Sequence, residues 1–312
     1  MNRDDIQFRL AEGDRLLLDG ATGSELQRRG VNVSKGVTSE GGLGAWSATA
    51  MGDAPDLVRE VHEDYLREGA DIITTNSFWT NRERLGMVGL ADRMEEYTHL
   101  AAEIACEARD RLNPQAYVAG SMAPPGWGDL TKEFSDQSAV LAAGGVDIIL
   151  LEYVGSVADC VQAVQAASRT GLPIFLGLKH VTLEGTNSAG ETFEQLARAL
   201  EGQRVDAILP MCSRPEEISA SLPMLRAAFE GPVGAYANIG YNQSSERPEF
   251  PKRQWHVIEI DDYPPDRYAE FARAWLDMGA QIIGGCCATG PEHIAAIRPV
   301  VKGLEKEKAL DS

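Results

Sequence analysis

The sequence predicts an α/β protein that folds as a single (β/α)8 (TIM) barrel, and three observations carry that prediction. Eight short apolar runs alternate with longer helical patterns along the chain. The runs are apolar at nearly every position, as in strands of a parallel sheet that is buried on both faces. The length of 312 residues suits one closed barrel of eight βα units. We expect the barrel to occupy residues 1–304, followed by a flexible tail over residues 305–312.

Each element follows from its local pattern of apolar, glycine and proline residues. An open doubly wound sheet is the alternative, but no run is followed by the G-x-G-x-x-G turn common in such sheets. Two long segments, residues 31–51 and 239–264, follow expected strands and would lie over the catalytic face of a barrel. The strands are expected over residues 15–20, 71–76, 116–121, 147–153, 173–178, 205–211, 232–238 and 281–285, and the helices over residues 55–68, 91–112, 135–143, 157–169, 192–202, 215–229, 265–278 and 291–304.

Charge and composition narrow the classes of partner. The formal net charge is -18, which disfavours binding to a nucleic-acid backbone or to an anionic membrane surface. No apolar run approaches the length of a membrane span. The first 14 residues lack the apolar segment of a secretory signal, and five cysteines without such a signal suit a reducing compartment. We therefore expect a cytoplasmic protein with small-molecule partners, and its oligomeric state, including a homo-oligomer, is left open.

Polar and metal-binding side chains gather where the expected strands end, while the strand bodies stay apolar. In a barrel these ends converge on one mouth, which is where active sites form. The residues concerned are Asp19, Thr75, Asn76, Glu152, Cys212, Asn238, Cys286 and Cys287.

Three of these residues are cysteines, which suggests a metal site. Cys212 ends the sixth strand, and Cys286 and Cys287 follow the eighth. Thiolates favour zinc in a tetrahedral arrangement, and three protein ligands leave the fourth position open for a substrate. A thiol entering there would lose its proton and become a nucleophile at neutral pH, which is the chemistry of S-alkylation.

Other interpretations of the cysteines remain open at this point. Adjacent cysteines can be redox-active or incidental, and neighbours on a strand point to opposite faces unless the strand ends or bends. Gly284 and Gly285 supply that freedom. Cys106 and Cys160 lie within helical patterns, and we expect them to be packing residues.

Three motifs resemble the homocysteine S-methyltransferase family over almost the whole chain. Residues 284–294, Gly-Gly-Cys-Cys-Ala-Thr-Gly-Pro-Glu-His-Ile, resemble its double-cysteine signature, which is highly specific. Residues 18–26, Leu-Asp-Gly-Ala-Thr-Gly-Ser-Glu-Leu, are similar to its opening motif, and residues 69–78 are similar to its second strand. The resemblance implies a (β/α)8 barrel with a zinc site. It also implies an enzyme that transfers a methyl group to homocysteine and so forms methionine.

The resemblance also implies roles for individual residues. Cys212, Cys286 and Cys287 match the zinc ligands. Asp19 and Glu152 match acidic positions that face the amino group of homocysteine, a cation that needs carboxylates. Gly20 and Thr75 match positions near its carboxylate, together with Asn238. His293 belongs to the signature, but it begins a helix and is expected to be structural. Ala288 and residues 121–127 depart from the common pattern, which leaves the donor side of the pocket without matched residues.

The methyl donor is the least constrained part of the prediction. The sequence contains no folate or cobalamin module beside the barrel, so we expect a small donor with an activated methyl group. Four rings at or near strand ends could hold such a cation, because aromatic faces attract onium groups. They are Trp46, Phe78, Trp79 and Tyr153, and Trp127 could add a fifth.

These rings favour a betaine-like quaternary ammonium donor. The alternatives are S-methylmethionine or another sulfonium compound as donor, ordinary packing as the role of the rings, and a related thiol or selenol as acceptor. A non-enzymatic zinc-binding or thiol-storage barrel is the rival from another class, although it would need neither the two carboxylates nor the rings.

Overall fold

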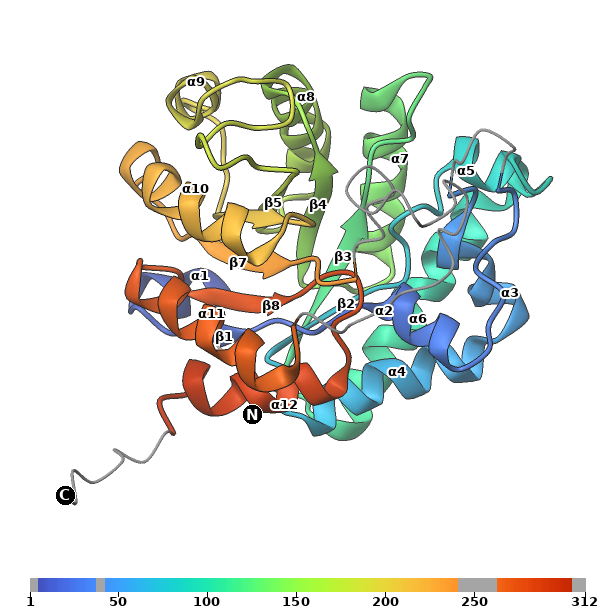
Figure 1. The fold of residues 1–312 in the computed structure, drawn as a ribbon. Coiled ribbons are helices and arrows are strands. Elements are labelled where there is room, and N and C mark those ends of the chain that lie inside the picture. Colours follow the sequence, from blue (N-terminus) through green and yellow to red (C-terminus); the bar gives the residue numbers. More distant parts are fainter. Residues whose placement is uncertain (1–4, 38–42, 241–262, 305–312) are drawn as a thin grey trace, which may run out of the picture.

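The computed structural model describes residues 5–37, 43–240 and 263–304, and these form a barrel of eight parallel strands (Figure 1). Hydrogen-bonded neighbours run in the order β1-β8-β7-β6-β5-β4-β3-β2. A parallel bridge between Leu18 and Ile72 joins β1 to β2 and closes the ring. The predicted (β/α)8 barrel is therefore confirmed, and the open sheet was the wrong alternative.

No strand extends more than one residue beyond its expected range, but several strands are shorter than expected. The apolar runs continue into the loops, so hydrophobicity alone overestimates the length of the hydrogen-bonded segment. The strands are β1 (Leu16–Leu17), β2 (Ile72–Thr74), β3 (Tyr117–Met122), β4 (Ile148–Val154), β5 (Ile174–Lys179), β6 (Ala207–Met211), β7 (Gly234–Ala237) and β8 (Ile282–Gly285).

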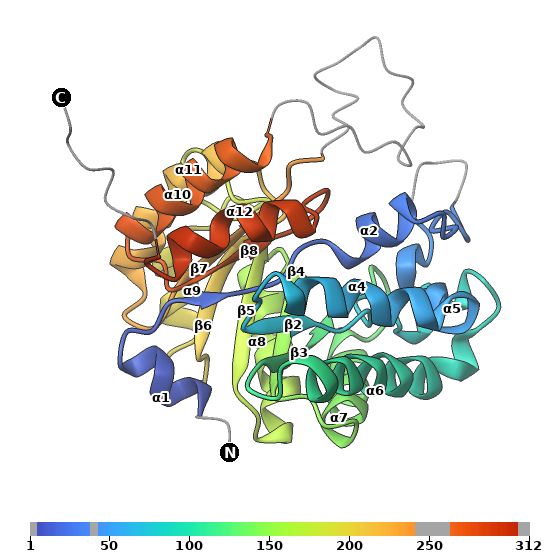
Figure 2. The same cartoon turned by 90° about the horizontal axis from the view of Figure 1, so that it is seen from below.

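The expected helices cover the outside of the barrel, and Figure 2 shows α4, α6 and α7 side by side there. Helix α7 begins five residues earlier than predicted, because the side chain of Asp129 accepts a hydrogen bond from the amide of Lys132 at 3.0 Å and caps the helix there. The covering helices are α4 (Pro55–Arg67), α6 (Met94–Leu112), α7 (Leu130–Ala143), α8 (Val157–Ala167), α9 (Phe193–Ala199), α10 (Pro215–Ala228), α11 (Pro265–Asp277) and α12 (Pro291–Val301).

Four short helices were not predicted, because about two turns or fewer are too short for a 3.6-residue periodicity to show. They are α1 (Ile6–Ala11), α2 (Thr22–Arg28), α3 (Ala50–Asp53) and α5 (Arg82–Gly86). Helix α1 packs Ile6 and Leu10 against the residues that fill the inside of the barrel. No helix within the described ranges has both the length and the apolar character to cross a bilayer.

A repeated aspartate organises the amino-terminal ends of the strands. Asp71, Asp147 and Asp206 directly precede β2, β4 and β6. Each carboxylate accepts a hydrogen bond from a backbone N–H of the preceding strand, at distances of 2.7 to 2.8 Å. The donors are Leu17, Val118 and Ile174. These bonds fix the register at the end of the barrel opposite the predicted mouth, so the site is held by strands whose far ends are tied together.

Gly284 marks the closest approach of β8 to β1. A Cβ atom at this position would lie 2.6 Å from Cβ of Leu18 and 2.8 Å from the backbone oxygen of Asp19. Backbone atoms cannot move aside as a flexible side chain can, so only glycine fits. The close contact between β1 and β8, which we call the seam and which positions Asp19 beside β8, therefore depends on this residue.

We predict that Gly284→Ala lowers the free energy of unfolding by about 1–3 kcal/mol, the usual range for overpacking a tight core. Denaturant titration of the variant would measure the loss. Gly86→Ala is the matched control, since its Cβ would meet its nearest neighbour at 3.6 Å, an ordinary contact. Equal stability of Gly284→Ala and the wild type would contradict this view of the seam.

Candidate active site

A cavity of about 210 Å³ lies at the carboxyl ends of the strands. The three predicted metal ligands, the five residues matched to homocysteine binding and the four predicted rings all line it, from the first strand end to the eighth. Of the two long loops, residues 31–51 contribute Leu43, Trp46 and Ser47 to its wall. The second loop lies almost entirely outside the described residues. The cavity therefore brings together side chains from segments that are far apart in the sequence.

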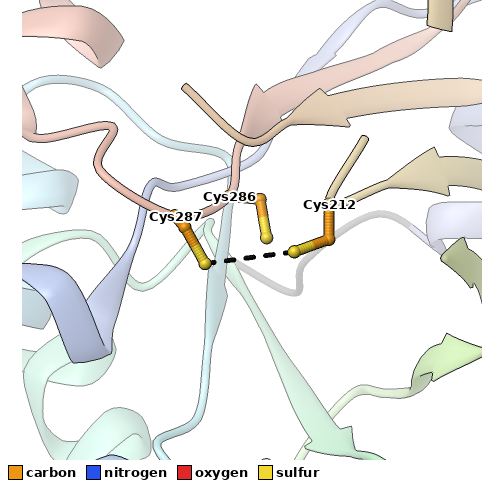
Figure 3. A group of neighbouring side chains, drawn as sticks. All are labelled: Cys212, Cys286 and Cys287. Atoms are coloured by element: carbon orange, nitrogen blue, oxygen red, sulfur yellow. Dashed lines mark hydrogen bonds between the residues drawn. The ribbon is translucent and has the colours of Figure 1, made fainter. Parts of the chain in front are cut away.

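The three predicted cysteines converge on one point (Figure 3). Their sulfur atoms all lie within 4.8 Å of one another, and those of Cys212 and Cys287 are 3.9 Å apart. Because β8 ends at Gly285, Cys286 and Cys287 lie beyond the alternation of the strand and can turn toward the same point. A tetrahedral site with Zn–S bonds of roughly 2.3 Å needs sulfur separations of about 3.8 Å. The donor set and its spacing thus fit zinc.

The thiols also influence one another electrostatically. Hydrogen bonds from Cys212 and then Cys286 hold the pKa of Cys287 well below its usual range. The thiol of Cys286 donates first to Cys212, and its pKa is raised. The side-chain amide of Asn238 lies within 3.5 Å of the sulfur of Cys212 and can donate to it. The cluster therefore favours negative charge on one sulfur, that of Cys287, and disfavours it on the other two.

Asp19 is one of two buried carboxyl groups on the cavity wall. It accepts hydrogen bonds from the amide of Thr74 at 2.6 Å and from the hydroxyl of the same residue at 2.8 Å. Burial nevertheless raises the pKa of Asp19 to about 8, and the charge of Glu152 adds to the increase. Without a cation beside it, this group holds its proton at neutral pH.

Glu152 is the second buried carboxyl. It accepts hydrogen bonds from the hydroxyl of Ser121 and from the hydroxyl of Tyr236, the latter at 3.0 Å. Burial raises the pKa of Glu152 to about 7 despite these donors. Sequence reasoning missed Ser121 and Tyr236 as partners. Tyr236 could have been found, because it is two residues before Asn238 in the run expected as the seventh strand, residues 232–238, and alternate residues of a strand share one face.

Thr75 and Gly20 occupy more constrained positions than the sequence suggested. The hydroxyl of Thr75 accepts from the amide of Ser121 at 2.9 Å and pairs with the hydroxyl of Ser77 at 2.6 Å. A Cβ atom on Gly20 would lie 2.8 Å from the backbone oxygen of Thr289, so the position must stay bare. Thr75 therefore shapes the wall of the cavity through the hydrogen bonds of its hydroxyl, and Gly20 does so through the close approach of its backbone.

Four predicted rings form an aromatic wall, which we define as Trp46, Phe78, Trp79 and Tyr153. The centroid of Phe78 lies 5.0 Å from that of Trp79 and 5.9 Å from that of Tyr153. The indole of Trp46 packs over Gly23, where a Cβ atom would lie 2.1 Å from its Nε1. All four rings line the cavity that the cysteines and carboxyls also face.

Two rings of the aromatic wall already carry a cation from the protein itself. The guanidinium carbon of Arg84 lies 3.9 Å from the centroid of Trp79, and Nζ of Lys179 lies 4.5 Å from that of Tyr153. Among the described residues, these contacts leave Trp46 and Phe78 as the two rings of the wall on which no cation of the protein stacks. A cage made from all four rings would therefore compete with cations that are already in place.

Trp127, the ring that could have added a fifth, lies apart from the other four. Trp127 is 54% exposed and does not line the cavity. Gly126 and Gly128 flank it with φ values of +105° and +84°, in the left-handed region, and the loop turns its side chain outward. The amide of Trp127 donates to Glu83 at 3.2 Å.

The remaining signature and cysteine residues have structural positions. Nδ1 of His293 accepts a hydrogen bond from the amide of Gly290 at 3.3 Å, at the start of α12. Its Nε2 lies 3.1 Å from the backbone oxygen of Tyr263. Cys160 is fully buried, and the thiol of Cys106 lies against the backbone at the end of α7. These arrangements agree with the packing role that we expected for the two cysteines and the structural role that we expected for His293.

Backbone strain is concentrated at the mouth. Among the described residues, five that are not glycine have φ values of 47° to 69°. Three of them, Trp46, Tyr153 and Cys212, line the cavity. Such conformations cost about 1–3 kcal/mol each and persist where the surrounding structure enforces them, often at functional sites.

Comparison with known proteins places the chain in a family. The family model described as Homocysteine S-methyltransferase matches residues 16–301. The chain belongs to this family. It is 28% identical to Homocysteine S-methyltransferase 4 of Zea mays, over 94% of this chain and 91% of that protein. It is 26% identical to Homocysteine S-methyltransferase YbgG of Bacillus subtilis, over 96% of this chain and 98% of that protein.

A longer relative and a solved structure extend the comparison. A methionine synthase of Mycobacterium tuberculosis is 28% identical over 92% of this chain, which spans 25% of that protein. The metallated form of the homocysteine methyltransferase MmuM from Escherichia coli superposes with a TM-score of 0.76 at 24% identity, covering 95% of this chain and 99% of that one. This likeness supports the barrel fold.

The two buried carboxyls predict a dependence of stability on pH. Their pKa values in the folded protein are raised above those of the unfolded chain, so the stabilisation from their neutral forms is present at low pH. It is lost as the pH rises through about 7 for Glu152 and about 8 for Asp19. We predict that Glu152→Gln, which stays neutral, flattens the fall in the free energy of unfolding between about pH 5 and about pH 7.

Denaturant titration of the substrate-free protein across this range would measure the slope. Glu60→Gln is the control for the loss of one negative charge, because its side chain is 59% exposed. Identical slopes for Glu152→Gln and the wild type would show that Glu152 is ionised throughout.

Proposed function

We propose that this protein is a zinc-dependent enzyme that transfers a methyl group from a small onium donor to the thiol of homocysteine, giving methionine. One observation carries the proposal: three sulfur atoms within 4.8 Å of one another face the same cavity as two buried carboxyls. A zinc-storage or thiol-storage barrel would need the first feature but not the second. The family membership and the names of the relatives support homocysteine as acceptor.

The metal would be held by Cys212, Cys286 and Cys287. Zinc, when bound, supplies a Lewis acid that favours the thiolate form of an entering thiol at neutral pH. Asn238 donates toward the sulfur of Cys212 and helps to orient that ligand. Adjacent cysteines form strained disulfides, which makes a redox role of Cys286 and Cys287 the weaker alternative.

Asp19 and Glu152 would bind the ammonium group of homocysteine. Burial favours their neutral forms in the empty cavity, and an ammonium restores the charged forms by pairing with them. Thr74, Ser121 and Tyr236 hold the two carboxyl groups on the wall through hydrogen bonds. The acceptor is thereby oriented with its sulfur toward the cysteines, and orientation is a major part of catalysis.

Methyl transfer would be a direct displacement. The thiolate sulfur forms a bond to the methyl carbon, and the carbon–nitrogen or carbon–sulfur bond of the donor breaks. Its electron pair leaves with a neutral amine or thioether. The aromatic wall would stabilise the onium charge and exclude water while the methyl group faces the sulfur.

For the donor, we propose first a betaine-like quaternary ammonium, because all four rings of the aromatic wall line the cavity. A sulfonium compound such as S-methylmethionine is the second candidate. The cations already stacked on Trp79 and Tyr153 favour it, since a donor that is not fully caged by rings needs fewer free ring faces.

We predict that the purified, reduced protein holds about one zinc ion per chain and methylates homocysteine. Replacing Cys212 or Cys287 with alanine should remove both properties, because two thiolates hold zinc far less tightly than three. Metal analysis and a methionine-forming assay would check this. Cys106→Ala is the control, as its thiol lies at the end of α7. Full activity of a zinc-free preparation would end the zinc proposal.

We predict that Trp46→Ala raises the KM for the donor roughly two- to thirtyfold and leaves the KM for homocysteine unchanged, since one ring face contributes roughly 0.5–2 kcal/mol to binding a cation. Trp79→Ala should have the smaller effect, because Arg84 already stacks on that ring. Turnover with glycine betaine, dimethylsulfoniopropionate and S-methylmethionine would be compared side by side.

Trp127→Ala is the control, since this indole is exposed and lies away from the cavity. A strong preference for S-methylmethionine together with no effect of Trp46→Ala would show that the rings are packing residues.

A further inference from the structure

The segment that follows β8 carries two of the three cysteines, and separate elements hold it in place. On the side of β7, the amide of Cys286 donates to the backbone oxygen of Ala237 at 2.9 Å. The backbone oxygen of Cys287 accepts from the amide of Ile239 at 3.1 Å. These bonds fix the two cysteine residues themselves. The next residue, Ala288, is held by a different element, helix α2.

Ala288 is bonded to α2 through both of its backbone polar groups. Its amide donates to the hydroxyl of Ser24 at 3.1 Å, and its carbonyl oxygen accepts from Nη2 of Arg28. Ser24 is buried and lines the cavity. Nη1 of Arg28 donates to Glu25 at 2.6 Å, which fixes the guanidinium in place. We call Ser24 and Arg28 together the clamp.

The clamp holds Ala288 in a strained conformation. The φ of Ala288 is 69°, in the left-handed region that is unfavourable for a residue with a Cβ atom. Its side chain is fully buried. Two directional bonds to this one residue oppose its relaxation to an ordinary backbone conformation. Because Cys287 is the adjacent residue, a change of φ at Ala288 would shift the direction of the chain that carries the sulfur.

Other bonds join the same segment to the start of α2. The amide of Ala21 donates to the backbone oxygen of Thr289 at 2.9 Å. The hydroxyl of Tyr65 lies 3.2 Å from the backbone oxygens of both residues. These bonds do not involve the clamp, so α2 keeps contacts to the segment when one clamp bond is removed. A substitution in the clamp therefore acts first on Ala288.

We propose that Ser24 and Arg28 are positioning residues for the metal site. By holding Ala288, they keep the three sulfur atoms in the close arrangement that the structure shows. The inference rests on the proposed function, in which these thiols bind zinc. A site whose ligands are already arranged binds its metal more tightly, because binding does not have to order them. If only a fraction of the metal-free molecules has the competent arrangement, the apparent affinity falls by that fraction.

A purely structural role of the clamp predicts a different result. The two side chains could simply attach α2 to the barrel. Loss of either bond would then lower the free energy of unfolding and leave the zinc affinity of the folded protein unchanged. Measuring both quantities on the same variants separates the two roles.

The test measures the zinc dissociation constant of the reduced protein by competition with a chromophoric chelator. We expect Ser24→Ala and Arg28→Gln each to raise it roughly two- to tenfold, the range for one lost hydrogen bond. Ser24→Thr keeps the hydroxyl and should retain most of the affinity. Glycine adopts a φ of 69° freely, so the effect of Ser24→Ala should shrink in an Ala288→Gly background.

Two matched controls lose the same kinds of bond elsewhere. The hydroxyl of Ser156 accepts from the amide of Asp159 at 3.1 Å at the start of α8, so Ser156→Ala is the control for the serine variant. Nη1 of Arg204 donates to the backbone oxygen of Gly171 at 3.1 Å, so Arg204→Gln is the control for the arginine variant. Both controls should bind zinc as the wild type does.

Unchanged zinc affinity in both clamp variants, with only the free energy of unfolding lowered, would overturn the proposal. An equal loss of affinity in the two controls would also overturn it, because the effect would then be one of general stability. Zinc binding that depends on the clamp, without methylation of homocysteine, would uphold the clamp and refute the proposed function. A reduced wild-type protein that binds no zinc would refute both.

Discussion

The geometry of the mouth depends on where β8 ends. Adjacent residues on a strand point to opposite faces, so Cys286 and Cys287 can approach one centre only beyond its last residue. The chain is nevertheless well fixed there. The amide of Cys286 donates to Ala237 at 2.9 Å, and the hydroxyl of Thr289 donates back to the backbone oxygen of Cys286 at 2.6 Å. The strand stops, but its hydrogen bonding to β7 continues, and this places both sulfur atoms opposite Cys212.

A second constraint is the balance of charge in the cavity. Asp19 and Glu152 are the carboxyl groups that line it among the described residues, and both are buried. The proposed reaction brings in one ammonium and one onium group, so it supplies two cations to a cavity with two carboxyls. Without a cation beside them, Asp19, with a pKa of about 8, is mostly protonated at neutral pH, and Glu152, with a pKa of about 7, is partly protonated; a cation paired with either group favours its charged form.

The sequence predicted the barrel well because parallel strands that are buried on both faces leave a continuous apolar run, and eight such runs are visible. It also predicted the residues that gather at the strand ends, since a barrel fixes where those ends meet.

Short helices such as α2 were missed because they contain too few turns to show a period. Ser121 and Tyr236 were missed because each acts through another side chain. The role of Trp127 stayed open because two flanking glycines, rather than its own chemistry, decide which way it points. Arg84 and Lys179 could not be connected to the rings, because the packing that joins them involves separate βα units.

The strained residues at the mouth have a consequence for how this protein can change. Trp46, Tyr153 and Cys212 adopt left-handed backbone conformations that glycine or asparagine would adopt with less strain. At each position, the residue that would relax the backbone is one that lacks the ring or the sulfur. Selection for a sturdier fold and selection for catalysis therefore pull in opposite directions at the same three places. A lineage that lost the need for methyl transfer should accumulate relaxing substitutions there first, and the barrel beneath would remain intact.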